Sequence, residues 1–376
     1  MKMLYITTFA KSRFGSFAKS SIEAARQLGI EYHIAANENG VDQVAKDKEC
    51  AELGIYHHNI DINRNPSAVA RNFRAYKQIM ELIERYHFDV IHCNTPMGGV
   101  LGRLCGHKAG VKTVIYQAHG FHFWTGAPLK NWLCYYPVER YLAHYTDILI
   151  TINKEDNMRA QKFHLKNGGK LYSVPGVGVN VEKITDLVVD RADFREKYGI
   201  PNDGYVFLSV GEVNENKNHI VGIKAFVKAN IPNSYYVICG TGEKEEMLRE
   251  YIKNIGMEKK ILLLGYQTGI PQILKSCDCF IFTSFREGLP GALMEAMAAD
   301  LPCIATRIRG CTDLLDGSKY LFDPTDENKL AELMKKIVDP SERISEIERN
   351  KVAIRPYDIN AALDGLKKIY QSIIEE

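Results

Sequence analysis

Residues 280–295 read FIFTSFREGLPGALME, an apolar run followed by a loop and then by helical spacing. The apolar run does not alternate with polar residues, which is typical of a strand buried on both faces of a parallel sheet. Gly288 permits close backbone approach, and Pro290 is favoured in the first turn of a helix. The stretch predicts a buried strand, a ligand-binding loop and a helix N-terminus that can receive an anion.

Similar apolar runs recur along the whole chain, and most are followed by a helical pattern. At 376 residues the chain is long enough for two cores, so the alternation predicts α/β architecture in two domains. We expect one domain over residues 1–178 and another over 179–356, separated by the Pro/Gly-rich stretch 174–180, and then a helix over 357–376. The expected strands are residues 4–8, 32–36, 90–93, 113–117, 148–152, 205–210, 235–239, 261–264, 279–283 and 302–306.

The composition is that of an ordinary globular protein, with 45% hydrophobic and 25% charged residues. A net charge of +2 gives no reason to expect a nucleic-acid partner, and no apolar run is long enough to span a membrane. Nine scattered cysteines indicate a reducing compartment, so we expect a cytoplasmic protein. Cys277 and Cys279 lie in an apolar run without a second pair, which favours core packing over metal binding.

Two acidic residues delimit the motif after the strand at 280–283. Glu287 precedes the predicted helix and Glu295 lies inside it, about 7–8 Å along the axis from Pro290 at the standard helical rise. The two carboxylates can therefore contact different parts of one extended ligand. A pair of solvated acids flanking a turn is the alternative interpretation.

Other polar residues follow other predicted strands. Lys217, in the loop that starts at Gly211, is a cation after a predicted strand and is a candidate to neutralise a negatively charged ligand. Gly240 and Gly242 form either a ligand-binding turn or a structural one, and Tyr266 offers an aromatic face in the next loop.

The first domain offers a second set of candidates. Gly15 and Ser16 lie between the first strand and a helix expected near Ser16, where a ligand can approach the backbone. The dinucleotide fingerprint Gly-x-Gly-x-x-Gly is absent from this loop, which argues against a nicotinamide-dependent dehydrogenase. His119 follows the strand at 113–117 and is a candidate for contact with substrate, a structural histidine being the alternative.

An aromatic segment follows, residues 124–145, which contains both tryptophans. Its helical spacing after Asn131 suits a helix at a membrane surface or in an acceptor groove, or a helix packed on its own sheet. Weak contact with a membrane therefore remains among the expectations.

On the Glu-x7-Glu signature at Glu287 and Glu295, the chain resembles the retaining glycosyltransferases of family 4. The resemblance covers nearly the whole chain. It implies the GT-B fold, in which two Rossmann-like domains face each other across a cleft and the C-terminal helix crosses back to the first domain. One departure stands out, since Glu212 occupies a position where the family usually carries an arginine.

The resemblance also implies roles for single residues. Glu287 faces the hydroxyls of the sugar, Glu295 faces the ribose and Lys217 meets the diphosphate. His119 faces the sugar being transferred. The sugar pocket is lined, largely through backbone, by Gly288, Leu289, Pro290 and Gly291.

The combined expectation is a metal-independent enzyme without a cofactor that transfers a hexose or N-acetylhexosamine from a UDP-sugar. The acceptor is expected to be a hydroxyl of a glycan or lipid-linked saccharide in capsule, exopolysaccharide or O-antigen assembly, which would place the enzyme at the inner face of the cytoplasmic membrane. Two alternatives stay open: a nucleotide-sugar epimerase of the same fold, and a non-catalytic module that binds sugar nucleotides.

Overall fold

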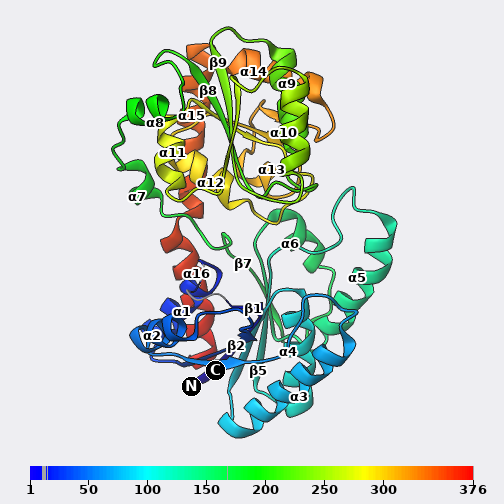
Figure 1. Ribbon diagram of the computed structural model, residues 1–376. Coiled ribbons are helices and arrows are strands. Elements are labelled where there is room, and N and C mark those ends of the chain that lie inside the picture. Colours follow the sequence, from blue (N-terminus) through cyan, green and yellow to red (C-terminus); the bar gives the residue numbers. More distant parts are fainter. Residues whose placement is uncertain (11–13, 15, 167, 376) are drawn as a thin grey trace. The chain divides into compact units, whose positions relative to one another are not determined.

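The computed structural model describes residues 1–376 apart from 11–13, 15, 167 and 376. The chain forms two compact units, one of residues 1–177 together with 359–376 and the other of residues 178–358. Each unit is built around one parallel sheet with helices packed against it (Figure 1). The predicted α/β class with two Rossmann-like units is confirmed.

The first unit holds a seven-stranded sheet in the order β3-β2-β1-β4-β5-β6-β7. The order reverses direction between β1 and β4, so the loops after these two strands diverge to opposite faces and leave room for a ligand at the carboxyl edge. The strands are β1 Lys2–Phe9, β2 Glu31–Asn37, β3 Tyr56–Asn59, β4 Val90–Asn94, β5 Thr113–Ala118, β6 Ile148–Thr151 and β7 Lys170–Ser173. The helices are α1 Ser16–Gln27, α2 Gln43–Leu53, α3 Val69–Tyr86, α4 Pro96–Ala109, α5 Leu129–Ala143, α6 Lys154–Ala160 and α16 Ile359–Glu375.

The second unit holds a six-stranded sheet in the order β10-β9-β8-β11-β12-β13, which reverses between β8 and β11. Its strands are β8 Tyr205–Val210, β9 Ser234–Cys239, β10 Ile261–Gly265, β11 Cys279–Phe282, β12 Cys303–Thr306 and β13 Leu321–Phe322. Its helices are α7 Val181–Thr185, α8 Arg191–Lys197, α9 His219–Ala229, α10 Glu245–Asn254, α11 Ile270–Ser276, α12 Gly291–Ala298, α13 Cys311–Leu314, α14 Glu327–Ile337 and α15 Pro340–Ile354, followed by a 3-10 helix, Arg355–Tyr357.

The C-terminal helix α16 is part of the first unit, where it packs against α1. Its apolar face, which includes Leu366, Ile369 and Ile373, is buried. The buried hydroxyl of Tyr370 lies 2.6 Å from Ser21 Oγ and 2.6 Å from His92 Nδ1. Because both partners are themselves buried, these hydrogen bonds fix the position of the helix along its axis as well as its contact face.

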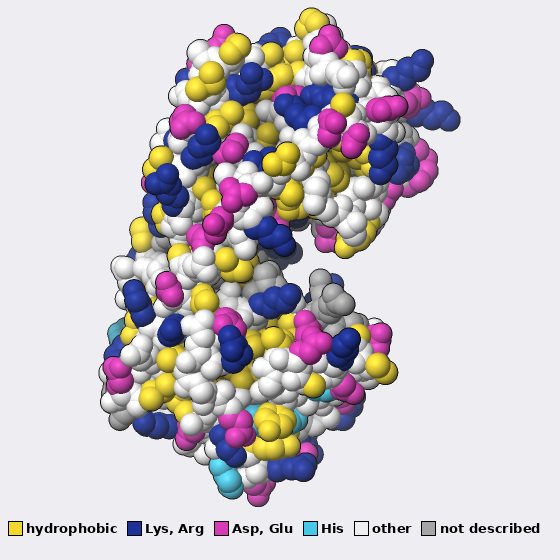
Figure 2. All heavy atoms as spheres, turned by 90° about the vertical axis from the view of Figure 1, so that its left-hand side faces the viewer, with side chains coloured by type: hydrophobic (Ala, Val, Ile, Leu, Met, Phe, Trp, Pro, Cys, Tyr) yellow, Lys and Arg dark blue, Asp and Glu magenta, His cyan; other side chains and the backbone are white. Residues whose placement is uncertain are grey.

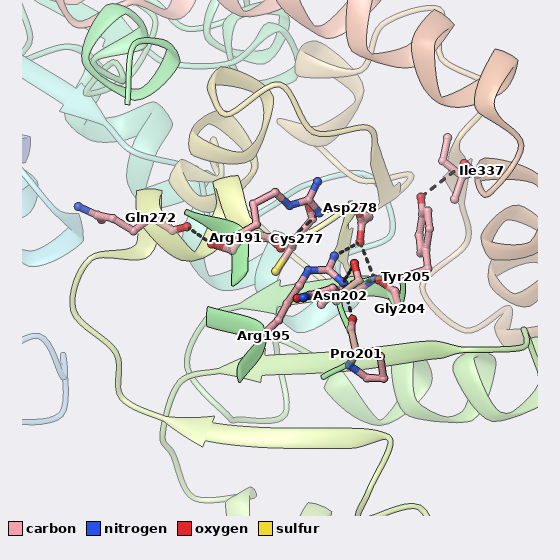
Figure 3. Close-up of polar contacts among 12 residues, drawn as sticks. Arg191, Arg195, Pro201, Asn202, Gly204, Tyr205, Gln272, Cys277, Asp278 and Ile337 are labelled. Carbon is pink, nitrogen blue, oxygen red and sulfur yellow. Dashed lines mark hydrogen bonds and ion pairs between the residues drawn. The ribbon is translucent and has the colours of Figure 1, made fainter. Parts of the chain in front are cut away.

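In the second unit, Asp278 joins helix α8 to the sheet (Figure 3). Its carboxylate accepts from Arg191 Nη2 at 2.5 Å, from Arg195 Nη2 at 3.0 Å and from the backbone N–H of Val206 at 2.8 Å. Arg195 also donates to the backbone carbonyls of residues 201, 202 and 204. This buried guanidinium therefore holds the turn that leads into β8.

The expected strands all form, with ends that shift by one or two residues. Three further strands, β3, β7 and β13, were missed. β3 and β7 read YHHN and KLYS and lie at the sheet edges, where a strand does not need an apolar run. β13 is two residues long. The core packing of Cys277 and Cys279 is confirmed, since both thiols are buried.

Among the described residues, no helix combines the length and the apolar character that a membrane crossing requires.

Candidate functional site

Two loops of the second unit meet where its strand order reverses. One follows β8 and runs from Gly211 to Asn218, and the other follows β11 and runs from Thr283 to Pro290. Ligands of open α/β sheets bind at the carboxyl ends of the strands at such a reversal. Both loops carry candidate residues from the sequence, and the structure brings them together.

Lys217 and Glu287 form an ion pair across these loops. Lys217 Nζ lies 2.7 Å from Glu287 Oε1, and the side chains retain 22% and 18% of their accessible surface. The ammonium also lies 5.2 Å from the centre of the Phe282 ring. The pair is thus shielded from bulk water on one side and still within reach of a ligand.

Hydrogen bonds to backbone carbonyls hold the two loops together beside this pair. Phe285 N donates to Asn216 O at 2.8 Å, and Asn216 Nδ2 donates to Arg286 O at 3.1 Å. Thr283 Oγ1 donates to Lys217 O at 2.6 Å. The cation and the carboxylate are therefore held by a rigid backbone, which suits electrostatic stabilisation because little reorganisation is needed.

Helix α12 begins at Gly291, directly after the loop that carries Glu287. Pro290 is the N-cap residue, with φ −79° and ψ 110°, so its expected place inside the first turn is wrong by one position. Among the described residues no side chain caps this helix, and its first turn holds no acid. The first backbone N–H groups of α12 are consequently available to an anion.

Glu295 lies on α12 and is partly buried. Burial raises the pKa of its carboxyl above the ordinary value. No described residue donates a hydrogen bond to this carboxylate. A half-buried acid without a donor is costly, and hydroxyl groups of a ligand would offset that cost.

Gly240 and Gly242, after β9, are needed for packing, whether or not they also contact a ligand. A Cβ at Gly240 would stand 1.8 Å from Gly211 O, and one at Gly242 would stand 2.3 Å from Val213 O. These glycines let the β9 turn lie directly on the loop that leads to Lys217. Tyr266, after β10, is exposed.

Arg309 and Gly310, after β12, were missed by sequence reasoning. The buried Arg309 donates from Nε to Glu287 O at 2.9 Å. Gly310 has φ +77°, and a Cβ there would stand 2.4 Å from Gly288 O. Both residues follow β12, at the same carboxyl edge of the sheet as the other two loops. A search for polar residues and glycines after each predicted strand would therefore also have found them.

The other candidate residues between Glu287 and α12 differ in their exposure to solvent. Gly288 and Leu289 are partly exposed, Pro290 is buried and Gly291 is exposed. Glu212, the departure from the family pattern, is exposed.

His119 of the first unit follows β5 and contacts Asn94 at the end of β4. His119 Nε2 lies 2.7 Å from Asn94 Oδ1. Because burial lowers the pKa of His119 to about 4, the ring is neutral near pH 7. The amide oxygen can only accept, so Nε2 carries the proton and Nδ1 is an acceptor. The Nδ1 atom is itself buried in this structure.

Asn94 and the next residue, Thr95, were not predicted. Thr95 has φ 62° and ψ 157°, a conformation that a β-branched residue rarely adopts. Its Oγ1 lies 2.5 Å from Thr8 Oγ1, which joins the loops after β4 and β1 at the reversal of the first sheet. Ser16 begins α1, as expected, whereas the candidate Gly15 lies outside the described residues.

A surface cavity of about 360 Å³ lies elsewhere in the second unit, at the amino ends of β8 and β11. Arg191, Arg195 and Asp278 line it and are bonded to one another or to backbone carbonyls, as Figure 3 shows. We therefore assign it a structural role.

Charges are mixed on the face of the molecule shown in Figure 2, where basic and acidic side chains alternate without a continuous basic stripe. Among the described residues, no group of three or more His, Cys, Asp or Glu side chains is arranged to hold a metal ion.

Comparison with known proteins identifies the family. The model described as glycosyl transferases group 1 matches residues 190–354, and the model described as glycosyl transferase 4-like matches residues 9–153. EpsD of Bacillus subtilis (strain 168), which carries a provisional glycosyltransferase name, is 34% identical over 384 residues, covering 100% of this chain and 97% of EpsD. The chain belongs to the family 4 glycosyltransferases.

Other relatives agree with this glycosyltransferase assignment. UDP-Gal:alpha-D-GlcNAc-diphosphoundecaprenol alpha-1,3-galactosyltransferase of Escherichia coli is 29% identical over 321 residues, covering 83% of this chain and 82% of that enzyme. The solved structure of HepE from Anabaena in complex with UDP and glucose has a TM-score of 0.77 at 16% identity, covering 99% of this chain and 100% of HepE. That likeness shows the GT-B fold.

Proposed function

We propose that this glycosyltransferase moves a hexose or N-acetylhexosamine from a UDP-sugar to a hydroxyl of a glycan or lipid-linked saccharide, with retention of configuration and without a metal ion. The observation that carries the proposal is the Lys217–Glu287 pair beside the uncapped start of α12. The UDP-Gal donor and the diphosphoundecaprenol-linked acceptor in the name of the Escherichia coli relative support this substrate class.

In this proposal the donor diphosphate is held by the first N–H groups of α12 and by Lys217. As the bond from the anomeric carbon to the diphosphate breaks, its electron pair passes to a diphosphate oxygen. The ammonium and the helix dipole stabilise the negative charge that develops there. Removing one such preorganised contact typically costs roughly 10²–10³ in turnover.

The acceptor hydroxyl forms the new bond to the anomeric carbon on the face that the diphosphate leaves. Its proton passes to the departing diphosphate, so that charge and atoms balance without a protein nucleophile. Glu287 accepts from the sugar hydroxyls, and Glu295 accepts from the ribose. In this proposal His119, which is neutral near pH 7, faces the sugar being transferred.

The test uses the full chain with a panel of UDP- and GDP-sugars. Thermal stabilisation identifies the nucleotide, and transfer is then measured with a saccharide-diphospho-lipid analogue as acceptor. The anomeric coupling constant of the product reports retention, and an excess of EDTA tests metal independence.

We expect a UDP-sugar to be favoured, an α-linked product from an α-linked donor, and full turnover in EDTA. Transfer from a GDP-sugar alone would contradict the donor assignment, and inversion would contradict the mechanism. Interconversion of the sugar without any acceptor would instead identify an epimerase.

A further inference from the structure

Helix α5 of the first unit has an inner face in the core and an outer face in solvent. On the inner face Trp132 and Tyr136 pack beside the buried ring of Phe123. On the outer face Leu129 and Leu133 are 72% and 68% exposed. We call the set Leu129, Lys130, Leu133, Pro137, Arg140 and Tyr141 the outer face of α5; all six are exposed.

The apolar members of this face form a row. Leu129, Leu133, Pro137 and Tyr141 follow one another at intervals of four residues, so they lie on one side of the helix. At the standard rise the row is about 18 Å long. Single exposed leucines are ordinary on protein surfaces, but a continuous apolar row indicates a partner.

The charges that α5 itself exposes beside this row have one sign. Lys130 and Arg140 are exposed on the same face. The helix, every residue of which the structure describes, carries one acid, Glu139, and its Oε2 lies 2.8 Å from Nη1 of the buried Arg103. That ion pair turns the acid toward the core, so the outer face combines apolar groups with uncompensated cations.

We infer that the outer face of α5 is a docking surface for an anionic lipid membrane, with the helix lying in the plane of the interface. Apolar side chains enter the boundary between headgroups and acyl chains, while lysine and arginine meet the lipid phosphates. A second copy of the chain fits less well, because a symmetric contact would bring the cations of both copies together. The inference adds a surface to the proposed function and does not depend on the identity of the donor.

The experiment measures co-sedimentation of the full chain with phosphatidylcholine vesicles and with vesicles that also contain phosphatidylglycerol. We expect binding to the anionic vesicles and much weaker binding to the neutral ones. Leu133→Glu and the double variant Lys130→Gln/Arg140→Gln should each weaken binding on the order of tenfold. Val44→Glu is the matched control, because Val44 is 81% exposed on another helix of the same unit, and it should bind as the wild type does.

Three outcomes would overturn the inference: no binding of the wild type to anionic vesicles, equal binding by Leu133→Glu, or a dimer in velocity sedimentation that Leu133→Glu dissociates. Transfer to a water-soluble acceptor, measured on the same samples, should be unchanged by the α5 variants. Loss of vesicle binding in the α5 variants with intact transfer would therefore bear only on the role of this surface. Absence of transfer in every sample would bear only on the proposed function.

Discussion

Lys217 Nζ and Glu287 Oε1 lie 2.7 Å apart although the two residues are separated by 70 positions in the sequence. The pair sits at the reversal of strand order in the second sheet, between the loops after β8 and β11. In the unliganded enzyme the carboxylate holds the ammonium in place. In the proposed complex the diphosphate brings a second anion to the same cation, so the two partners should respond differently to substitution.

Glu287→Gln should lower transfer roughly 10²-fold or more, because the amide keeps the shape of the side chain but loses the charge. The affinity for UDP should stay near that of the wild type or rise, since Lys217 is then free for the diphosphate. Turnover and calorimetric titration with UDP measure the two effects. Glu215→Gln is the control, because Glu215 lies in the loop after β8 and is paired with Lys244 at 3.0 Å. Transfer at full rate by Glu287→Gln would contradict the site assignment.

Gly310→Ala should disturb the loop from Thr283 to Pro290, whereas Gly317→Ala should not. Both glycines have positive φ, at +77° and +73°, so alanine at either costs about 1–2 kcal/mol of stability. Only at Gly310 would the Cβ also meet a backbone atom, Gly288 O at 2.4 Å, while nothing lies within 4 Å of a Cβ at Gly317. UDP affinity should therefore fall in Gly310→Ala alone. Equal affinities for the two variants would show that the close approach does not shape the site.

Glu295 should make UDP binding depend on pH. Burial raises the pKa of its carboxyl, and in the proposed complex the ribose hydroxyls donate to the charged form, so the affinity should fall as pH drops through that raised pKa. Glu295→Gln should bind UDP more weakly and without this pH dependence, while Glu287→Gln should keep it. Calorimetric titration across the acidic range measures the difference.

The same pKa shift has the opposite sign for folding. A carboxyl whose pKa is raised in the folded state favours folding most when it is protonated, and this contribution is lost as pH rises through the folded pKa. The unliganded Glu295→Gln variant should therefore unfold at a higher temperature than the wild type near neutral pH. The difference should vanish in acid, and a lower unfolding temperature near neutral pH would show that the carboxylate has a donor.

Tyr370→Phe should destabilise the first unit by about 1–3 kcal/mol, because Ser21 and His92 lose a buried hydrogen-bond partner. Both tryptophans, Trp124 and Trp132, lie in this unit, so tryptophan fluorescence in urea follows its unfolding separately from the second unit. Tyr56→Phe on the exposed strand β3 is the control and should have little effect. Equal midpoints for the two variants would mean that apolar contacts alone hold α16.

The fold was largely predictable, since buried strands of parallel sheets need apolar residues on both faces. The runs that became β8 and β11 are of this kind. Edge strands are not under that constraint, and the polar β3 was missed for this reason. Pro290 was placed one position too far into α12, because its fixed φ suits both the cap and the first turn.

Site residues that belong to a sequence motif were predictable, whereas residues that act only through contacts in the folded structure were not. Glu287, Glu295 and Lys217 stood out by type and position, whereas the ion pair between Lys217 and Glu287 appears only in the structure. Asn94 and Thr95 act on neighbouring loops through side-chain hydrogen bonds and, for Thr95, an unusual backbone angle. Such contacts depend on side-chain direction across strands, which spacing along one sequence does not encode.

The position of α16 has a consequence during synthesis of the chain. The first unit begins at residue 1, but its last helix is formed by residues 359–375. These residues are synthesised only after the whole second unit has been synthesised. At about 5–20 residues per second this interval is on the order of ten seconds or more. Over that time the nascent first unit carries an open apolar groove where Leu366, Ile369 and Tyr370 will later sit. A stop codon that removes only the last helix would therefore leave the second unit intact and make the first unit, which is synthesised earlier, the target of chaperones and proteases.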